Sequence, residues 1–367
     1  MTKVPAGAFL LDGKRISVMA SCFIPASDFE FPLEDIEETA RRNGLLSIEI
    51  EFSRRCNFRC PYCYVPRQSD LSQELTRSEI KGVILQAASL GARKIIILGG
   101  EPTIYPHLVE MIAFIRNHGL AVEMFTNGSG ISADMAGVLA AHAVRVVLKM
   151  NSFDEATQDR LTGVPGSYRQ IQQTLGHLKQ AGYPSDDLFL AVSTVICRDN
   201  RNEILPMWTW LREQGIAPYF EIITPQANAV DHPELEVSPA DLERLFNAIA
   251  RLDREKFGHV WEPQPPLVGN KCLRHRFSCL VTARGDVLPC VGVTIPVGNI
   301  RTTPLADILR DSEVIQNLKR HRETIKGPCR DCDRAAECYG CRGAAFQMTG
   351  DYLASDPLCW KNNRRAN

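Results

Sequence analysis

Short runs of apolar, β-favouring residues alternate with amphipathic segments from Leu45 onward. The segments between the runs have the hydrophobic spacing of helices. Strict alternation of strand and helix favours parallel strands joined by right-handed crossovers. The apolar runs predict six strands, at residues 46–52, 94–98, 121–125, 144–149, 189–196 and 219–223. Six units are fewer than the eight of a closed barrel, so the pattern predicts an α/β fold with an open, partial (β/α)6 TIM-like barrel.

Several predicted helices have recognisable first residues. Thr76 and Glu79 are spaced as a capping box, Ser132 is placed as an N-cap, and Ser238 precedes Pro239 at a first helical position. In a barrel of parallel strands the carboxyl ends meet at one edge, and the active site lies there. Catalytic and ligand-binding residues are therefore expected directly after the predicted strands.

The pattern changes after the last predicted helix. The stretch WEPQPPLVGNK at 261–271 is rich in proline and has no periodicity, which indicates a linker, and a cysteine-dense tail follows it. We expect four parts: an N-terminal extension at 1–45, the barrel at 46–257, the linker at 258–271 and a small second domain at 272–367. The sequence of the N-terminal extension indicates no function for it.

Composition and charge narrow the class of protein. The chain has 367 residues, and 44% of them are hydrophobic, enough for a sizeable core. Because 42 Lys and Arg nearly balance 43 Asp and Glu, no overall field favours nucleic acid or an anionic membrane. No apolar run is long enough to span a membrane, and the N-terminus MTKVPAGAFLLDGKR lacks the features of a secretory signal, so the cytoplasm is the expected compartment. In such a reducing compartment, 13 cysteines point to metal.

Three cysteines follow the first predicted strand. In RRCNFRCPYCY, Cys56, Cys60 and Cys63 have the spacing C-x3-C-x2-C. A cubane cluster has four irons, so three cysteines leave one iron free for an outside ligand. The spacing alone also fits a zinc site or buried thiols. Tyr62, just before the last cysteine, could pack against a cluster or an adenine ring.

This cysteine motif, together with Leu98-Gly99-Gly100-Glu101-Pro102 after the second predicted strand, resembles the radical S-adenosylmethionine (SAM) superfamily and its GGEP motif. The resemblance implies a 4Fe-4S cluster on the three cysteines, with SAM on the open iron. It also implies that the glycines allow close approach of the backbone to a ligand, and that Glu101 and nearby main-chain groups bind the SAM ammonium. The reduced cluster would then cleave SAM to methionine and a 5′-deoxyadenosyl radical that abstracts a substrate hydrogen.

The resemblance places further SAM contacts after the later strands. Asn127 and Gly128 could equally be a turn that ends a strand, and Arg198 could be a solvated loop charge. The SAM contacts that the resemblance implies after these strands are Thr126, Asn127, Lys149, Asn151, Ser193 and Arg198.

The tail contains eight cysteines, which make two sets of four. Their arrangement, with Gly285-x4-Cys290 on a predicted hairpin, resembles the SPASM extension that carries two auxiliary 4Fe-4S clusters, which gives three clusters in total. The family pattern assigns auxiliary cluster I to Cys272, Cys279, Cys290 and Cys341, and auxiliary cluster II to Cys329, Cys332, Cys338 and Cys359. Cys338-x2-Cys341 departs from the three intervening residues of many relatives, which puts the geometry around Cys341 in doubt. The rival interpretation is one or two zinc ribbons, which would not explain the upstream motifs.

These features predict a radical SAM oxidoreductase that dehydrogenates its substrate or forms a bond oxidatively, because four-cysteine auxiliary clusters have no open iron and would accept an electron. The resemblance leads us to expect a small molecule or a ribosomal peptide as the substrate, and a flavodoxin- or ferredoxin-like electron donor. In the family, sulfatase maturation uses an acidic residue shortly after the third tail cysteine. Here Val291-Gly292-Val293-Thr294 follows Cys290, so the resemblance disfavours formylglycine formation. The alternative is a non-catalytic iron-sulfur electron carrier or scaffold. Cys22 and Cys197 are given no role.

Overall fold

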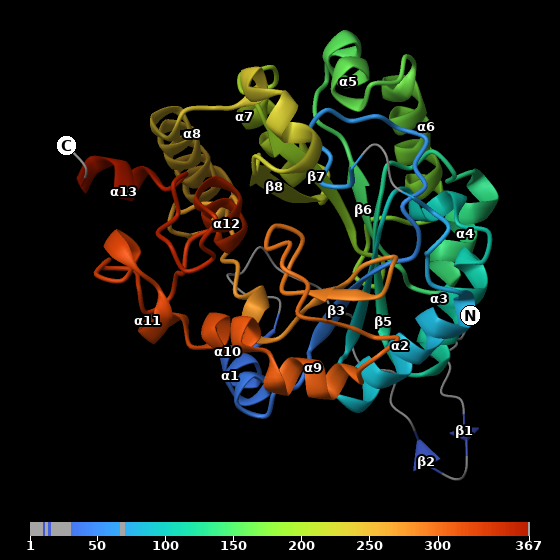
Figure 1. Ribbon diagram of the computed structural model, residues 1–367. Coiled ribbons are helices and arrows are strands. Elements are labelled where there is room, and N and C mark those ends of the chain that lie inside the picture. The colour runs from blue at the N-terminus through green and yellow to red at the C-terminus, as the bar shows by residue number, and fades with distance from the viewer. Residues whose placement is uncertain (1–9, 12–13, 16–30, 67–69, 366–367) are drawn as a thin grey trace.

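A computed structural model describes residues 10–11, 14–15, 31–66 and 70–365 (Figure 1). All six predicted parallel strands are present, and helices follow them in alternation. The strands are β3 (Ser47–Glu51), β4 (Lys94–Leu98), β5 (Ala121–Thr126), β6 (Arg145–Lys149), β7 (Leu190–Ile196) and β8 (Ala217–Ile222). The helices are α2 (Arg77–Ser89), α3 (Leu108–Asn117), α4 (Ala133–Ala141), α5 (Glu155–Thr162), α6 (Ser167–Gln180), α7 (Ile204–Glu213) and α8 (Pro239–Leu252).

The strands form one open sheet in the order β11-β10-β9-β3-β4-β5-β6-β7-β8, which confirms the open barrel. Each neighbouring pair from β3 to β8 is parallel. The predicted helix starts are also confirmed: Thr76 and Glu79 form a reciprocal capping box, and Ser132 and Ser238 accept from backbone N–H groups of the first turn.

The two faces of the sheet have different chemistry. Successive side chains of a strand point to opposite faces, and one set, such as Ile48, Ile95 and Val122, packs with the helices in the main core. The other set faces the inside of the barrel and includes charged side chains. Near the amino ends of the strands, Glu123 forms buried ion pairs with Lys94 (3.0 Å) and Arg145 (2.9 Å).

The tail continues the barrel sheet. Its strands are β9 (Leu280–Val281), β10 (Asp286–Leu288) and β11 (Gly298–Asn299), and its helices are α9 (Leu305–Asp311), α10 (Glu313–Lys319), α11 (His321–Thr324), α12 (Arg342–Thr349) and α13 (Trp360–Arg365). β9 and β10 form the predicted hairpin, and β9 pairs in parallel with β3, with Leu280 opposite Glu49. Figure 1 shows the tail, in orange and red, beside β3 and along α8.

The proline-rich stretch expected to be a linker lies along the other edge of the sheet. Val268 N–H donates to Phe220 O (2.9 Å), Ile222 N–H donates to Pro266 O (3.1 Å), and Leu267 bridges to Glu221. Its Trp261 packs against Trp208. Prolines remove N–H donors from this segment, so it pairs with β8 only in part.

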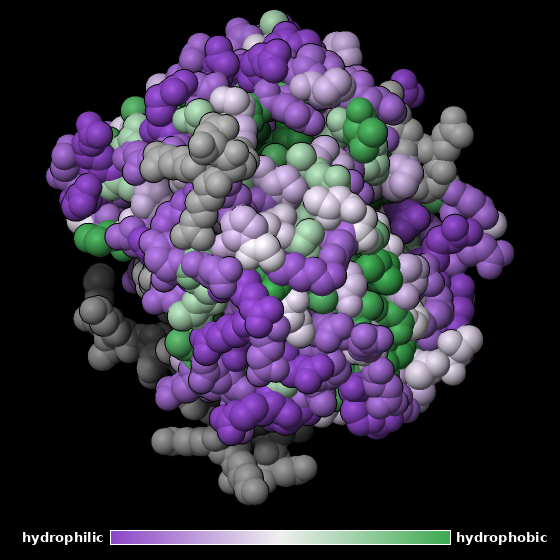
Figure 2. All heavy atoms as spheres, turned by 60° about the vertical axis from the view of Figure 1, so that its left-hand side comes forward, coloured by the Kyte–Doolittle hydropathy of each residue, from purple (hydrophilic) through white to green (hydrophobic). Residues whose placement is uncertain are grey.

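In the N-terminal extension, β1 (Leu10–Leu11) pairs with β2 (Lys14–Arg15), and α1 (Leu33–Arg41) packs on the tail. Ile36 of α1 lies in a small buried cluster with Leu273, Phe277 and Tyr339. Among the described helices, none combines the length and apolar character needed to cross a membrane. Figure 2 shows a largely hydrophilic face on which hydrophobic side chains lie in separate patches.

Candidate active site at the carboxyl ends of the strands

The loop with Cys56, Cys60 and Cys63 leaves the carboxyl end of β3 and is anchored along its length. At its start, Ser53 Oγ and Arg54 N–H donate to the Glu74 carboxylate (2.9 and 2.6 Å). In its middle, Arg59 N–H donates to Thr162 O (2.8 Å), and at its end Asn228 N–H donates to Cys63 O (3.3 Å). The three thiols are therefore presented on one fixed loop at the edge where a barrel active site is expected.

The Gly99-Gly100-Glu101 segment lies against the start of this loop. Gly100 N–H donates to Ser53 O and Glu101 N–H donates to Arg55 O, both at 2.8 Å. A Cβ on Gly99 would collide with Ser53 O, and one on Gly100 would collide with Arg55 O. In this structure the glycines thus allow close approach to the cysteine loop, a reason different from the contact with a ligand that the sequence suggested.

The Glu101 carboxylate is 3% exposed and joins the ends of β4 and β5. It accepts hydrogen bonds from Thr103 N–H (2.9 Å), Thr103 Oγ1 (2.6 Å), Thr126 Oγ1 (2.5 Å) and Asn127 N–H (2.6 Å). Burial raises the pKa of Glu101, while these hydrogen bonds oppose the rise because they favour the charged form. Pro102 begins the short 3-10 turn that follows, Pro102–Ile104.

Asn127 connects the end of β5 to the cysteine loop. Its Nδ2 donates to Asn57 Oδ1 (3.0 Å) and lies 3.9 Å from Cys56 Sγ. Ser129 Oγ also donates to Asn57 Oδ1 (3.2 Å). Asn57 was not singled out from the sequence, although its place between two of the cysteines is a signal that could have identified it.

Asn151 and Lys149 bring the end of β6 to Tyr62. Asn151 Nδ2 donates to Tyr62 OH (2.5 Å), and its Oδ1 accepts from Val195 N–H (3.0 Å). Lys149 Nζ lies 5.1 Å from the centre of the Tyr62 ring and donates to Ser193 Oγ (3.4 Å). The structure therefore places Tyr62 against a lysine and an asparagine.

Lys149 of β6 and Glu221 of β8 are buried groups whose charges interact across the barrel. Burial lowers the pKa of Lys149, and the charges of Glu221, Cys60 and Cys63 act in the opposite direction. Burial raises the pKa of Glu221, and Lys149 opposes the rise. Glu221 and Tyr219 of β8 were not named from the sequence, although both occupy alternate positions of a predicted strand.

The inner face of the barrel has an apolar side as well as this polar one. The apolar cluster consists of Ile96, Leu98, Leu280 and Leu288, with Phe125 and Val291 against it. Phe125 also meets the ring of Tyr219 edge to face, with ring centres 5.5 Å apart. We call the part of the inner face formed by this cluster and by Lys149, Ser193 and Glu221 the chamber; its combination of apolar and polar side chains is typical of a site for an organic substrate.

Arg198 is not brought into this group. Its side chain is exposed, its N–H donates to Leu235 O (2.8 Å), and its charge lies near Glu234. Cys197 is buried beside Leu161 and Leu235, whereas Cys22 lies outside the described residues.

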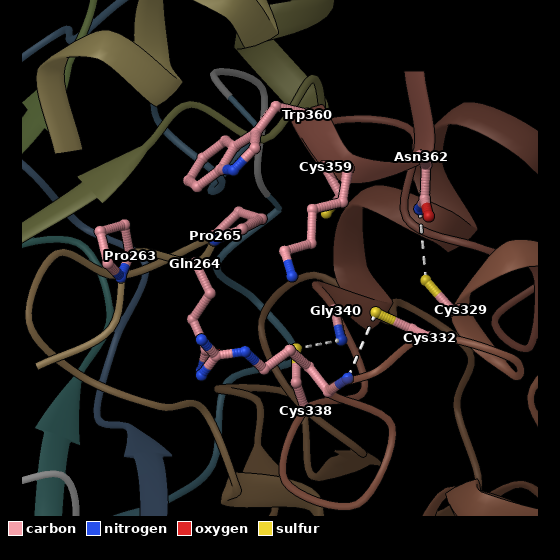
Figure 3. A pocket seen from close by; sticks show the side chains of 12 residues that line it. Pro263, Gln264, Pro265, Cys329, Cys332, Cys338, Gly340, Cys359, Trp360 and Asn362 are labelled. Carbon is pink, nitrogen blue, oxygen red and sulfur yellow. Dashed lines mark hydrogen bonds between the residues drawn. The ribbon is translucent and has the colours of Figure 1, made fainter. Parts of the chain in front are cut away.

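In the tail, four cysteines line one cavity. They are Cys329, Cys332, Cys338 and Cys359, and Pro263, Pro265 and Trp360 also line it (Figure 3). Three of the four sulfurs accept hydrogen bonds: Cys329 from Asn362 Nδ2 (3.3 Å), Cys332 from Arg334 N–H (3.5 Å) and Cys338 from Gly340 N–H (3.3 Å). These four residues are the set expected for auxiliary cluster II, and four thiols around one cavity fit the ligand requirement of a 4Fe-4S cluster.

The other set is brought together only in part. Burial raises the pKa of Cys290, and the charge of Cys272 adds to it. Burial likewise raises the pKa of Cys341, with further contributions from Asp356, Cys290 and Cys272. Cys279 is fully buried in the main apolar core, whereas Cys272 packs against a separate small cluster. Within residues 31–66 and 70–365, no three His, Cys, Asp or Glu side chains are placed to share a single metal ion.

Comparison with known proteins agrees with this geometry. Residues 50–211 match the model of the radical SAM superfamily, and residues 272–333 match that of an iron-sulfur cluster-binding domain, SPASM. The AdoMet-dependent heme synthase of Methanosarcina barkeri is 28% identical over 87% of this chain and 97% of the relative. The PqqA peptide cyclase of Methylocella silvestris is 30% identical over 86% of this chain and 87% of the relative.

Solved structures share the fold. The Streptococcus suis SuiB structure bound to S-adenosylmethionine aligns with a TM-score of 0.67 and 18% identity, over 87% of this chain and 78% of that one. The structure of anSMEcpe with bound AdoMet aligns with a TM-score of 0.66 and 14% identity, over 87% and 91% of the two chains.

The chain belongs to the radical SAM superfamily. Within it, the chain is one of the members with a C-terminal SPASM domain. Membership implies a 4Fe-4S cluster and SAM in the barrel, and further iron-sulfur clusters in the tail.

Proposed function

We propose that the chain is an enzyme that cleaves SAM reductively and oxidises an organic substrate in the chamber. The observation that carries the proposal is the attachment of one three-cysteine loop to the GGEP segment, through Gly100, Glu101 and Asn127. A 4Fe-4S cluster on Cys56, Cys60 and Cys63 would supply the electron that converts SAM to methionine and a 5′-deoxyadenosyl radical.

The SAM contacts in this proposal are Gly99, Gly100, Glu101, Pro102, Thr126, Asn127, Lys149, Asn151 and Ser193. The hydrogen bonds of Glu101 and Asn151 hold the carboxyl ends of β4 to β7 in a fixed arrangement around the cysteine loop. Positioning of this kind lowers the barrier to reaction because the reacting groups are already oriented. Arg198, which is exposed, is the least supported of the expected contacts.

The net reaction we propose is a dehydrogenation or an oxidative bond formation. The substrate would lose one hydrogen atom to the 5′-deoxyadenosyl radical, then one electron to an auxiliary cluster and one proton to a base. The charges of Cys272, a proposed auxiliary ligand, and Glu221 of β8 act on each other, which supports a short path from the chamber to an auxiliary cluster. The substrate is a small molecule or a peptide, the two kinds of product named for the heme synthase and the peptide cyclase relatives. The electron donor would be flavodoxin- or ferredoxin-like.

The test is to purify the chain without oxygen, reconstitute it with iron and sulfide, reduce it with dithionite and add SAM. We expect iron and sulfide for three 4Fe-4S clusters and formation of 5′-deoxyadenosine. Zinc with little sulfide would contradict the cluster assignments. Full cluster loading without 5′-deoxyadenosine would favour an electron carrier or scaffold instead.

Peptides encoded beside the gene and candidate small molecules should then be compared as substrates. An oxidised product with one 5′-deoxyadenosine released per substrate would support the net oxidation, and a redox-neutral product would contradict it.

A further inference from the structure

Asp356 lies between cysteines that are expected to hold different auxiliary clusters. Its side chain is 0% exposed. Its Oδ2 accepts from the N–H of Cys341 (2.7 Å), a residue expected for auxiliary cluster I. Its own N–H donates to the Sγ of Cys329 (3.4 Å), a residue expected for auxiliary cluster II. One buried residue is therefore hydrogen-bonded to a proposed ligand of each cluster.

The segment that follows Asp356 holds it in this place. Leu358 N–H donates to Asp356 Oδ1 (2.9 Å), and Cys359 N–H donates to the Asp356 carbonyl (3.3 Å). Asn362 Nδ2 donates both to that carbonyl (2.8 Å) and to Cys329 Sγ (3.3 Å), the second of which is drawn in Figure 3. Any displacement of Asp356 would therefore change the surroundings of Cys329.

Gly340 lets Asp356 approach the two sets of cysteines closely. Gly340 lies between Cys338, expected for auxiliary cluster II, and Cys341, and its N–H donates to Cys338 Sγ (3.3 Å). Its φ is +63°, and a Cβ at Gly340 would lie only 2.7 Å from the Cβ of Asp356. A residue with a side chain would force Asp356 away. The glycine thus keeps the carboxylate beside the turn at which the two sets of ligands meet.

Arg342 places the opposite charge at the same turn. It is 1% exposed, and a Cβ at Gly340 would lie 3.0 Å from Arg342 Nη2 and 3.2 Å from Asp356 Oδ2. The guanidinium and the carboxylate therefore both border Gly340. The Nε and Nη2 of Arg342 are buried and have no hydrogen-bond partner within the part of the chain that the structure describes. Buried donors without acceptors fit an anionic group, such as a cluster on Cys341, in the metal-loaded protein.

The Asp356 carboxylate has the surroundings of an ionised group, because two backbone N–H groups donate to it and a guanidinium lies nearby. In a site without water, such a charge acts strongly on its neighbours. The charge and the hydrogen bonds around an iron-sulfur cluster set its reduction potential. A negative charge lowers that potential, because it disfavours the addition of an electron.

We propose that the buried charge of Asp356 lowers the reduction potentials of both auxiliary clusters, and that Arg342 opposes this effect. The proposal rests on the proposed function, since it requires both clusters. Through this one residue the two clusters are controlled together. Lower potentials mean that only strong reductants, such as a carbon-centred radical of the substrate, give an electron to either cluster.

The first test compares Asp356→Asn with Asp351→Asn in the whole chain, purified without oxygen and loaded with iron and sulfide. Asp351 is the matched control because it also accepts from the N–H two residues ahead, that of Leu353 (2.9 Å), but it pairs with Lys326 at the surface. Redox titration followed by electron paramagnetic resonance measures the potentials. The signal that changes when SAM is added identifies the first cluster, so the other two belong to the tail.

We expect Asp356→Asn to retain the iron content of the parent chain and to shift both auxiliary midpoint potentials to less negative values. Asp351→Asn should leave both potentials unchanged. A loaded Asp356→Asn chain in which either auxiliary potential equals that of the parent would overturn the proposal.

Arg342→Gln keeps the proposal testable if Asp356→Asn binds less iron. Loss of the guanidinium should shift both potentials in the opposite direction, to more negative values, whereas a merely structural role predicts no such reversal. Potentials that stayed the same or became less negative would overturn the proposal. If the parent chain bound no iron and sulfide in its tail, the proposed function would fail as well, so the two failures can be told apart.

Discussion

The barrel and the tail hold their cysteines in different ways. In the barrel the three cysteines lie on one loop, residues 56–63, which is fastened to strand ends that a continuous apolar core supports. In the tail they are spread from Cys272 to Cys359 over short elements, including strands of two or three residues and a helix of four. The tail contributes Val281, Leu305 and Trp360 to the same apolar core, but its elements are short, so we expect the arrangement of its cysteines to depend on metal binding more than the barrel does.

Cys56→Ala tests the barrel side of this comparison and should have the largest effect on activity. We expect formation of 5′-deoxyadenosine to fall to background, because the first cluster loses one of three ligands. The melting temperature of the barrel should not change, since Cys56 is exposed and outside the core. A matched Cys197→Ala variant should keep its activity, and equal loss in both would argue against a special role for the trio.

Removal of iron with a chelator under reducing conditions should separate the two regions. We expect amides of the cysteine-rich tail to exchange hydrogen rapidly, while amides of β3 to β8 stay protected, because metal binding contributes folding free energy to metal-dependent modules. Hydrogen exchange with mass spectrometry measures both regions at once. Equal protection of the tail with and without iron would contradict the comparison.

Glu123→Ala should destabilise the barrel without removing a cluster. It would leave Lys94 and Arg145 buried without this carboxylate, a change that costs about 3–5 kcal/mol in the free energy of unfolding. Denaturant unfolding of the metal-loaded chain measures the cost, with Glu213→Ala in an exposed ion pair as the control. Iron content should equal that of the parent chain.

The same carboxylate gives a dependence on pH. Burial raises the pKa of Glu123, but Lys94 and Arg145 more than offset this and leave it lowered. A lowered folded pKa contributes stability that is present above the ordinary pKa of 4.5 and is lost as the pH falls toward the folded value. We therefore expect the acid limb of the stability curve to be flatter in Glu123→Ala than in the parent chain.

Glu101→Gln should have a smaller effect, at the junction between the core and the cysteine loop. An amide nitrogen would face the N–H and hydroxyl donors of Thr103, Thr126 and Asn127, and one unsatisfied buried group costs about 1–3 kcal/mol. We expect weaker SAM binding together with this loss, measured by calorimetry and unfolding. Glu110→Gln, at an exposed ion pair, is the matched control.

Arg301→Ala should have the smallest effect. Arg301, just after β11, donates to Glu79 of α2 (2.6 Å) and to the carbonyls of Gln73 and Glu74. Because the group is partly exposed, we expect the free energy of unfolding to change by less than about 1 kcal/mol. If the tail depended on this contact more than on metal, the change would exceed that of iron removal.

Much of the fold could be predicted because its elements have local signals. The six strands, the capping box at Thr76 and Glu79, and the N-caps at Ser132 and Ser238 all match the structure. The pairing of β9 with β3 could not be predicted, because it joins residues far apart in sequence and has no local pattern. The pairing of residues 261–271 with β8 could not be predicted for the same reason, because β8 is distant in sequence, and this stretch was therefore predicted to be a linker.

The candidate site shows the same limit. Cysteine spacing indicated the three cysteines at 56–63, and the resemblance to the SPASM extension grouped the four that line one cavity. Neither says on which face of a strand a cysteine lies. The resemblance to the SPASM extension grouped Cys279 with Cys272, whereas the pleat of the chain at β9 directs Cys279 to the helix side. Glu221 was missed because its relation to Lys149 spans two strands of the sheet.

The parallel strands end at β3 on one side and at β8 on the other, and residues that follow the barrel in sequence cover both ends. The segment around Leu267 lies along β8, and the hairpin ends in β11, a strand of only two residues. Uncovered strand edges present unpaired N–H and C=O groups, which invite pairing with other chains and lead to aggregation. A fragment that stopped at residue 257 would leave β3 and β8 open to such pairing, so recombinant expression should succeed with the whole chain and give insoluble material with the isolated barrel.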